Sequence, residues 1–130
     1  MDRKTFLTIV GTLGLVIATI ALGFPAVLLA GKGVAPEPAT CVWVREVGVL
    51  ILALSVVLLL VRAQPDSPTM RAVLWGNAIV HGGLFPIEIL AWHGSVIPRL
   101  DGIAPNSVLH VVVATGFVFF AQRVVTHSLD

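Results

Sequence analysis

Residues 72–92 read AVLWGNAIVHGGLFPIEILAW, and they form the one apolar segment of this chain that carries several polar side chains within it. Asn77, His81 and Glu88 interrupt a run that is long enough to cross a membrane, which takes about 20 apolar residues in a helix. A glycine pair and Pro86 punctuate the same run. We therefore expect the chain to be organised around this segment, with the cleaner apolar segments as walls around it.

The composition indicates a chain whose solvent is lipid. Of the 130 residues, 57% are hydrophobic and 12% are charged, against about 25% charged residues in soluble domains. The net charge of +1 gives no basic field, which excludes nucleic acid as a partner. Cys41 is the single cysteine, and no zinc-ligand spacing surrounds it. Membrane lipid is thus the expected partner of the surface, and neither a metal nor a cofactor is expected.

Four apolar segments predict four membrane-spanning helices. Ser67-Pro68 is a favourable helix start, because a capping hydroxyl is followed by proline at the first helical position. Thr40 is the expected cap of the second helix, and Asn106 or Ser107 that of the fourth. Pro25 is expected to kink the last third of the first helix. The chain is expected to form one transmembrane domain over 1–130, with helices over 5–30, 42–61, 68–93 and 107–125.

Short connections between four helices predict an all-α up-down bundle with both termini on one side of the membrane. Basic residues decide which side, because the cytoplasmic ends of spans carry an excess of Lys and Arg. Five of them flank the termini and the middle turn, and three lie on the other side. The sequence therefore predicts cytoplasmic termini. Small residues on the first helix are typical of close helix contact: Gly14, Ala18, Ala21 and Gly23.

Asn77, His81 and Glu88 are predicted to share one helix face. At 100° per residue, His81 lies about 40° and Glu88 about 20° around the helix from Asn77. An acidic side chain exposed to lipid at mid-membrane costs roughly 2.5–3.5 kcal/mol, so this face is expected to point into the bundle. Glu46 near the start of the second helix and His110 near the start of the fourth are expected at the level of Glu88. These five residues are the candidate ligand-binding residues.

Each candidate also has a plainer interpretation. Glu46 can serve only to cap its helix at the membrane interface. Asn77 and His81 can act as hydrogen-bonding contacts between neighbouring helices, and His110 can be a packing residue. The remaining histidines are expected to be solvated at the helix ends: His93 and His127.

Three stretches of the chain resemble the small bacterial four-helix membrane proteins of the DoxX-like group. They are WVREVGVLILAL at 43–54, LWGNAIVH at 74–81 and VLH at 108–110. That group is similar in helix arrangement to the eukaryotic membrane domain of sterol isomerases and sterol-binding receptors. The resemblance implies a protein of the bacterial inner membrane, with a pocket inside the bundle and acidic residues, here Glu46 and Glu88, lining it. The wider catalytic set of the isomerases is not recognisable, so their activity is not implied.

Several function classes remain open on the sequence. The preferred one is a module that binds a hydrophobic or amphipathic small molecule, such as a lipid, terpenoid or quinone, between its helices. A second is an accessory or structural subunit of a larger membrane complex, or a homodimer. A third is an isomerase-type enzyme with Glu46 and Glu88 as acid and base, or a metal site formed by these two residues and His110. A channel or pump is disfavoured, because one acidic cluster does not form a relay across the bilayer.

Overall fold

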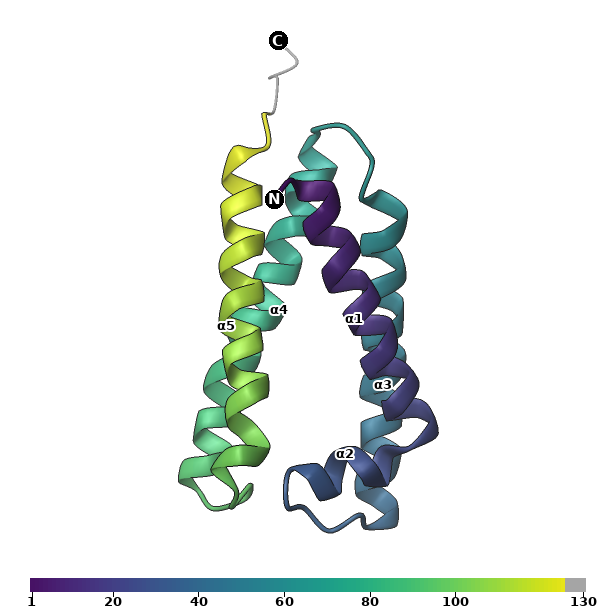
Figure 1. Cartoon of the computed structure of the whole chain (residues 1–130), viewed down its shortest axis with the longest axis vertical. Coiled ribbons are helices and arrows are strands. Elements are labelled where there is room, and N and C mark those ends of the chain that lie inside the picture. The colour runs from purple at the N-terminus through teal and green to yellow at the C-terminus, as the bar shows by residue number, and fades with distance from the viewer. Residues whose placement is uncertain (126–130) are drawn as a thin grey trace.

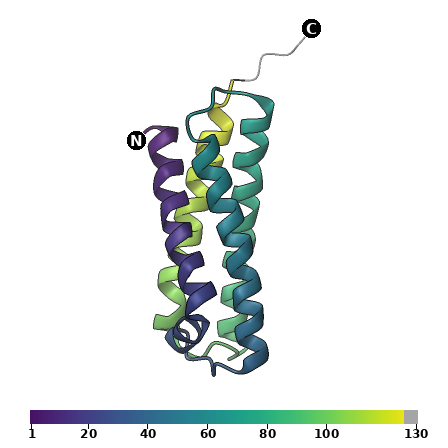
Figure 2. The same ribbon diagram turned by 90° about the vertical axis from the view of Figure 1, so that its right-hand side faces the viewer.

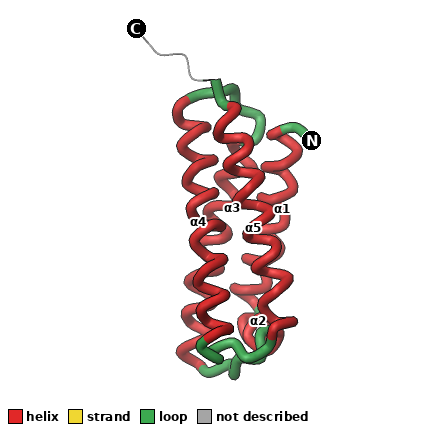
Figure 3. Tube along the Cα trace, turned by 90° about the vertical axis from the view of Figure 1, so that its left-hand side faces the viewer, coloured by secondary structure: helices red, strands yellow, loops and turns green. Residues whose placement is uncertain are grey.

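The structure, a computed structural model, describes residues 1–125 and contains five α-helices: α1 (Arg3–Gly23), α2 (Pro25–Gly31), α3 (Pro38–Val61), α4 (Pro68–His93) and α5 (Leu100–Arg123). No strand occurs among these residues (Figure 3). The four longer helices are long and apolar enough to cross a membrane. The predicted all-α fold is confirmed, and the chain is a small multi-pass membrane protein. His127 lies outside the described residues.

The outward faces of the spans suit a lipid environment. Ile79 and Leu90 are examples of apolar side chains that are largely exposed there. Two hydroxyl groups on these faces donate to the backbone of their own helix. Thr19 Oγ1 donates to the Leu15 carbonyl at 2.8 Å. Thr115 makes the equivalent bond one turn back on α5. These bonds leave no hydroxyl hydrogen of the two threonines unpaired against hydrocarbon.

The long helices form two antiparallel pairs. α1 packs along α3, and α4 packs along α5 (Figures 1 and 2). The two pairs lie closest near the end where α1 begins and α5 ends, and they diverge toward the opposite end (Figure 1). There α2 turns from α1 toward the second pair. The up-down order agrees with the prediction, but the arrangement is two splayed hairpins rather than an evenly packed bundle.

The first apolar segment folds as two helices, so the prediction of one kinked helix over 5–30 is wrong in its last third. Pro25 has no N–H to continue a helix, and a residue that precedes proline disfavours the helical conformation. Phe24 accordingly has φ −133° and ψ 52°, and α2 begins anew with Pro25 in its first turn. The Leu22 carbonyl, at the end of α1, accepts a hydrogen bond from Arg45 Nε at 3.2 Å. Arg45 on α3 thereby helps to satisfy the backbone at this break.

The ends of α4 match the prediction, whereas α3 begins earlier than expected. Ser67 caps α4 by accepting the Met70 N–H at 3.0 Å, and Gly94 follows its last residue. α3 begins at Pro38, so Thr40 lies inside its first turn and does not act as the cap. Proline is well suited to this first position, because its missing N–H has no partner there in any case.

The start of α5 differs most from the prediction. It begins at Leu100 and runs through Pro105, so Asn106 and Ser107 lie inside the helix and are not its caps. Proline is tolerated here because only the Asp101 carbonyl loses its intrahelical donor, and Asp101 is exposed in the first turn. The earlier start frees the side chains of Asn106 and Ser107 for contacts with α4.

Small residues bring α1 against α3, as the sequence predicts. Ala18 and Ala21 are fully or almost fully buried. A Cβ atom on Gly14 would lie 2.1 Å from Ser55 Oγ, so the backbone of α1 approaches α3 as closely as only glycine permits. Gly23 differs from the other members of the stripe, because a Cβ atom added there would have no neighbouring atom within 4 Å.

The apolar core lies at the end where α1 begins. The Phe6 ring on α1 meets the Phe117 ring on α5 edge to face, with centroids 5.0 Å apart. Both side chains are buried, at 5% and 0% exposure. This contact joins the first hairpin to the second. The buried cluster around it draws on all four long helices and the residue after α5: Phe6, Leu7, Leu58, Met70, Leu74, Ala78, Val113, Phe117, Ala121 and Val124.

A polar contact closes the same end. Asp66, in the turn between α3 and α4, forms an ion pair with Arg3 and accepts the Val125 N–H at 3.1 Å. Arg3 also donates to the Gln64 carbonyl at 2.8 Å. The Val125 N–H, followed by Arg3, lowers the pKa of Asp66. A lowered pKa in the folded state means that this contact stabilises the fold above the ordinary range of Asp, and its contribution is lost as the pH falls through the lowered value.

A second junction lies at the opposite end, where the chain leaving α2 reaches the start of α5. A Cβ atom on Gly102 would lie 2.8 Å from the Gly31 carbonyl oxygen and 2.8 Å from Lys32 Cα. Gly33 follows with φ 75°, a conformation that favours glycine. The backbones therefore meet directly, and this contact sets Lys32 beside the second hairpin.

We predict that Gly102→Ala destabilises the protein, because the added methyl group meets backbone atoms that move only if α2 moves. The expected loss is about 1–3 kcal/mol, as for other overpacked sites, measured as the free energy of unfolding in detergent micelles. Gly76→Ala on α4 is the control, since a Cβ there has no neighbour within 4 Å. That variant should be as stable as the parent or slightly more stable. Equal stability of the two variants would contradict the α2–α5 contact.

Candidate functional site

A cavity of about 450 Å³ lies between the two hairpins. Its volume falls within the range of roughly 300–1,000 Å³ that is common for small-molecule sites. The walls are mainly apolar and come from α1, α2, α3, α4 and α5, with a few polar side chains from α4 and α5. The larger apolar lining residues include Leu13, Ile17, Leu28, Val47, Ile51, Leu54, Val80, Leu84 and Leu109.

Four of the five predicted site residues line this cavity. Asn77, His81 and Glu88 do so from α4, which confirms that they share an inward face, and His110 does so from α5. Asn77 is 6% exposed and Glu88 is 8% exposed. Helix α4 continues unbroken through Pro86, so the shared face extends from Asn77 to Glu88.

Glu46 is not brought to this group. Its side chain is exposed, and it does not line the cavity. The reason is its place on the helix surface: Glu46 lies about 100° around α3 from Val47 and about 140° from Ile51, both of which line the cavity. The expected meeting of Glu46 with Glu88 and His110 is therefore wrong. Among residues 1–125, moreover, no three His, Cys, Asp or Glu side chains gather where they could hold a metal ion.

Glu88 is held by donors from two other segments of the chain. Lys32 Nζ, which follows α2, lies 2.9 Å from Glu88 Oε1. Ser107 Oγ on α5 donates to Glu88 Oε2 at 2.7 Å, and the Asn106 side-chain amide donates to Oε1. A charged carboxylate inside a helical membrane protein is tolerated only when it is paired in this way. The ion pair and its two supporting hydrogen bonds thus join both hairpins at one point.

The hydrogen-bond network continues from α5 back to α4. Asn106 Nδ2 lies 3.1 Å from His110 Nε2, and His110 Nδ1 lies 2.9 Å from His81 Nδ1. An amide nitrogen can only donate, so Nε2 of a neutral His110 is the acceptor and its Nδ1 carries the hydrogen. His110 then donates to His81 Nδ1, which leaves the hydrogen of a neutral His81 on Nε2. The network therefore has a direction, and it ends in a donor on His81.

Two polar atoms on α4 remain available to a ligand. Asn77 Nδ2 donates to the Val73 carbonyl at 2.9 Å, which leaves Asn77 Oδ1 as an acceptor. Neither this oxygen nor His81 Nε2 has a partner among the described residues. Among the described residues, every fully buried side-chain nitrogen or oxygen atom has a hydrogen-bond partner. Asn77 Oδ1 and His81 Nε2 have none, so they are not fully buried. Because both residues line the cavity, an acceptor and a donor lie one helical turn apart on its wall.

Three residues of this network escaped the sequence analysis: Lys32, Asn106 and Ser107. Lys32 was counted only as a loop charge, and the other two were expected to be helix caps. A signal was present for α5, because residues at spacings of three and four lie on one helix face. Ser107 and Asn106 stand in that relation to His110 once the helix is extended toward its N-terminus. No sequence pattern pairs Lys32 with Glu88. Lys32 reaches Glu88 because the helix break at Phe24 turns the chain toward the second hairpin.

Comparisons with protein-family models, with curated proteins and with solved structures give no match for this chain. The resemblance to the DoxX-like group therefore stays a prediction from the sequence. What the fold and site define is a class: a small multi-pass helical membrane protein with a largely apolar internal cavity and a directed polar network on one wall.

We predict that Lys32→Met destabilises the protein, because Glu88 then remains charged without its cation. Breaking a fully buried pair costs about 3–5 kcal/mol, and we expect roughly 1–3 kcal/mol here, since the Lys32 side chain is 30% exposed. The free energy of unfolding in detergent is the measurement.

Lys32→Met combined with Glu88→Gln is the matching control. The neutral amide oxygen can still accept from Ser107, so the double variant should recover most of the loss. If the two single effects simply add, Lys32 and Glu88 do not interact energetically.

Proposed function

We propose that this protein binds a neutral amphipathic small molecule, mainly hydrophobic and with a hydroxyl or carbonyl group at one end. The observation that carries the proposal is the accessible pair of Asn77 Oδ1 and His81 Nε2 inside a mainly apolar cavity. A hydroxyl can donate to the former and accept from the latter, and a carbonyl can accept from the latter. The apolar walls receive the rest of the molecule.

A neutral ligand is favoured by the distribution of charge around the cavity. Lys32 and Glu88 are the charged side chains that line it, and they neutralise each other. A ligand carboxylate or ammonium group would be desolvated there without a free partner, which costs several kcal/mol. Lipid-derived alcohols, terpenoids and quinones fit this chemistry.

The alternatives receive less support from the geometry. An isomerase with two carboxyl groups needs both within reach of one substrate, and Glu46 does not line the cavity. A role as an accessory subunit remains an alternative, and it requires no occupant of the cavity. Ligand retention and copurification with a partner protein therefore separate the two proposals.

We predict that a long-chain isoprenoid alcohol binds more tightly than the hydrocarbon or the carboxylic acid of the same skeleton. Asn77→Leu and His81→Phe preserve the approximate size of each side chain and remove its polar contact. Each should weaken binding of the alcohol about tenfold, since an unpaired polar group costs roughly 1–3 kcal/mol. Displacement of a fluorescent fatty probe in detergent micelles measures the affinity.

The control for this experiment is Thr115→Val, which removes a polar group from the outer face of α5. It should leave the affinity for the alcohol unchanged. Equal binding of alcohol and hydrocarbon, or no effect of either α4 substitution, would sink the proposal. Copurification with a partner protein and an empty cavity would then favour the accessory role.

The second proposal concerns the location of the protein: the bacterial inner membrane, with both termini in the cytoplasm. It is supported by five basic residues at the end that holds the start of α1 and the turn from α3 to α4, against three at the other end. Arg3, Lys4, Arg62, Arg71 and Arg123 belong to the first group. In this orientation the α2 end faces the periplasm.

Cys41 offers a direct test of this orientation, because it is the only cysteine and lies half-buried in the first turns of α3, at the α2 end. We predict that a membrane-impermeant maleimide labels it in spheroplasts. In a Cys41→Ser background, Gln64→Cys at the opposite end should be labelled only after the membrane is permeabilised. The reverse pattern would establish the opposite orientation.

A further inference from the structure

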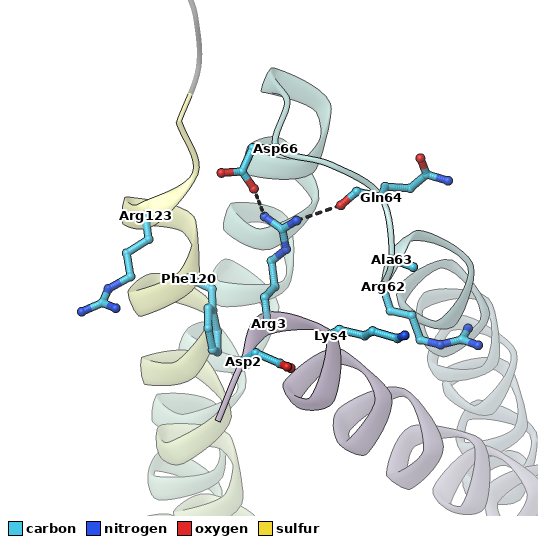
Figure 4. A pocket seen from close by; sticks show the side chains of 9 residues that line it. All are labelled: Asp2, Arg3, Lys4, Arg62, Ala63, Gln64, Asp66, Phe120 and Arg123. Atoms are coloured by element: carbon cyan, nitrogen blue, oxygen red, sulfur yellow. Dashed lines mark hydrogen bonds and ion pairs between the residues drawn. The ribbon is translucent and has the colours of Figure 1, made fainter.

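A second concavity lies at the end of the molecule where α1 begins. It is an open groove of about 520 Å³ between the start of α1, the turn from α3 to α4 and the end of α5 (Figure 4). Unlike the cavity between the hairpins, it is lined mainly by charged and polar side chains. The lining residues that carry the argument are Lys4, Arg62, Arg123 and Phe120, together with the engaged pair of Arg3 and Asp66.

Both acidic residues of the groove are already committed to other contacts. Asp2 caps α1 by accepting the Thr5 N–H at 2.7 Å. Asp66 accepts from Arg3 and from the Val125 N–H, as described above. Asp66 thus pairs with Arg3, whereas the Asp2 carboxylate keeps its charge and interacts with Lys4. Four basic and two acidic side chains line the groove, so it carries a net positive charge.

Three cations in the groove form no salt bridge among residues 1–125: Lys4, Arg62 and Arg123. Arg62 donates to the Leu59 carbonyl through one nitrogen, which leaves the rest of its guanidinium group available. Arg123 lies over the Phe119 ring, 4.0 Å from its centroid. In Figure 4, Lys4 and Arg62 extend to one side of Arg3, and Arg123 lies on the other. Arg123 points away from the other two, whereas Lys4 and Arg62 lie on the same side and can offer their donors to one phosphate group (Figure 4).

The position of the groove favours a phosphate carried by a lipid. α1 begins, α3 ends and α5 ends at this level, so the groove lies where the spans leave the hydrocarbon. Phe120 lines the groove, and Phe119 is 44% exposed on the surface of α5 below Arg123. A phosphate in the groove would therefore have apolar surface next to it for acyl chains, which a soluble phosphate does not need.

We propose that this groove binds the headgroup phosphate of an anionic phospholipid, with Lys4 and Arg62 as the contacts. The site is separate from the cavity between the hairpins, in both its residues and the charge of its ligand. It also differs from a general attraction to an anionic surface, because its contacts come from two segments that the fold brings together, the start of α1 and the end of α3.

The test uses the full chain in detergent and measures bound lipid by native mass spectrometry. Phosphatidylglycerol should be retained more strongly than phosphatidylcholine by the parent protein. Lys4→Gln combined with Arg62→Gln should weaken retention of phosphatidylglycerol by about thirtyfold, taking roughly fivefold for each basic residue near the lipid phosphate. Retention of phosphatidylcholine should change little.

The matched control removes the same charge outside the groove, with Arg71→Gln and Arg45→Gln combined. It should retain phosphatidylglycerol as the parent does. If the control variant also retains phosphatidylglycerol less well, by the same factor, the effect comes from net charge alone and the proposed site is wrong. Displacement of phosphatidylglycerol by equimolar inorganic phosphate or glycerol phosphate would assign the groove to a soluble anion, and equal retention of both lipids by the parent would also contradict the proposal.

Discussion

The ion pair between Lys32 and Glu88 is the interaction on which the open end of the molecule depends. A carboxylate within a membrane span must be partnered by the protein, because hydrocarbon supplies neither charge nor hydrogen bonds. Glu88 takes its cation from the chain after α2 and its further donors from α5. The contacts of this one carboxylate thus hold α4, α5 and the chain after α2 in fixed positions relative to one another. They do so at a level where the two hairpins otherwise diverge.

The two ends of the molecule are held together by different means. At the end where α1 begins, aromatic and aliphatic side chains such as Phe6 and Phe117 fill the space between the hairpins. At the other end the contacts are polar and come from the short helix α2 and the residues that follow it. Between them the helices are too far apart to close on each other, and the cavity occupies that space. Its shape is therefore a consequence of two different junctions.

Much of this could be predicted from the sequence, because lipid makes strong demands on a helix. The number of spans, the bounds of α4 and the common face of Asn77, His81 and Glu88 all follow from apolar run lengths and the helical period. Helix ends were less predictable. Pro25 was expected to kink a helix and instead separated two, while Pro105 was expected to precede a helix and lies inside one.

Those two prolines account for most of what was missed at the site. The break before Pro25 turns α2 toward the second hairpin and brings Lys32 to Glu88. The continuation through Pro105 places Asn106 and Ser107 on the helix instead of at its cap. Glu46 shows a different limit of the sequence analysis. Its depth along α3 could be estimated from the sequence. The direction of its side chain depends on which face of α3 packs against α1, and that is set by tertiary packing.

The pairing of α1 with α3 and of α4 with α5 also bears on how the protein is made. Each pair is continuous in sequence, with α2 inside the connection of the first pair, so each can enter the bilayer as a unit while the ribosome is still adding the next. The first unit is complete before Ser67 is synthesised. Association of the two units then brings Phe6 to Phe117, Arg3 to Asp66 and Lys32 to Glu88, and sets Gly102 against Gly31 and Lys32. In such a route the last step would be the docking of two halves within the plane of the membrane.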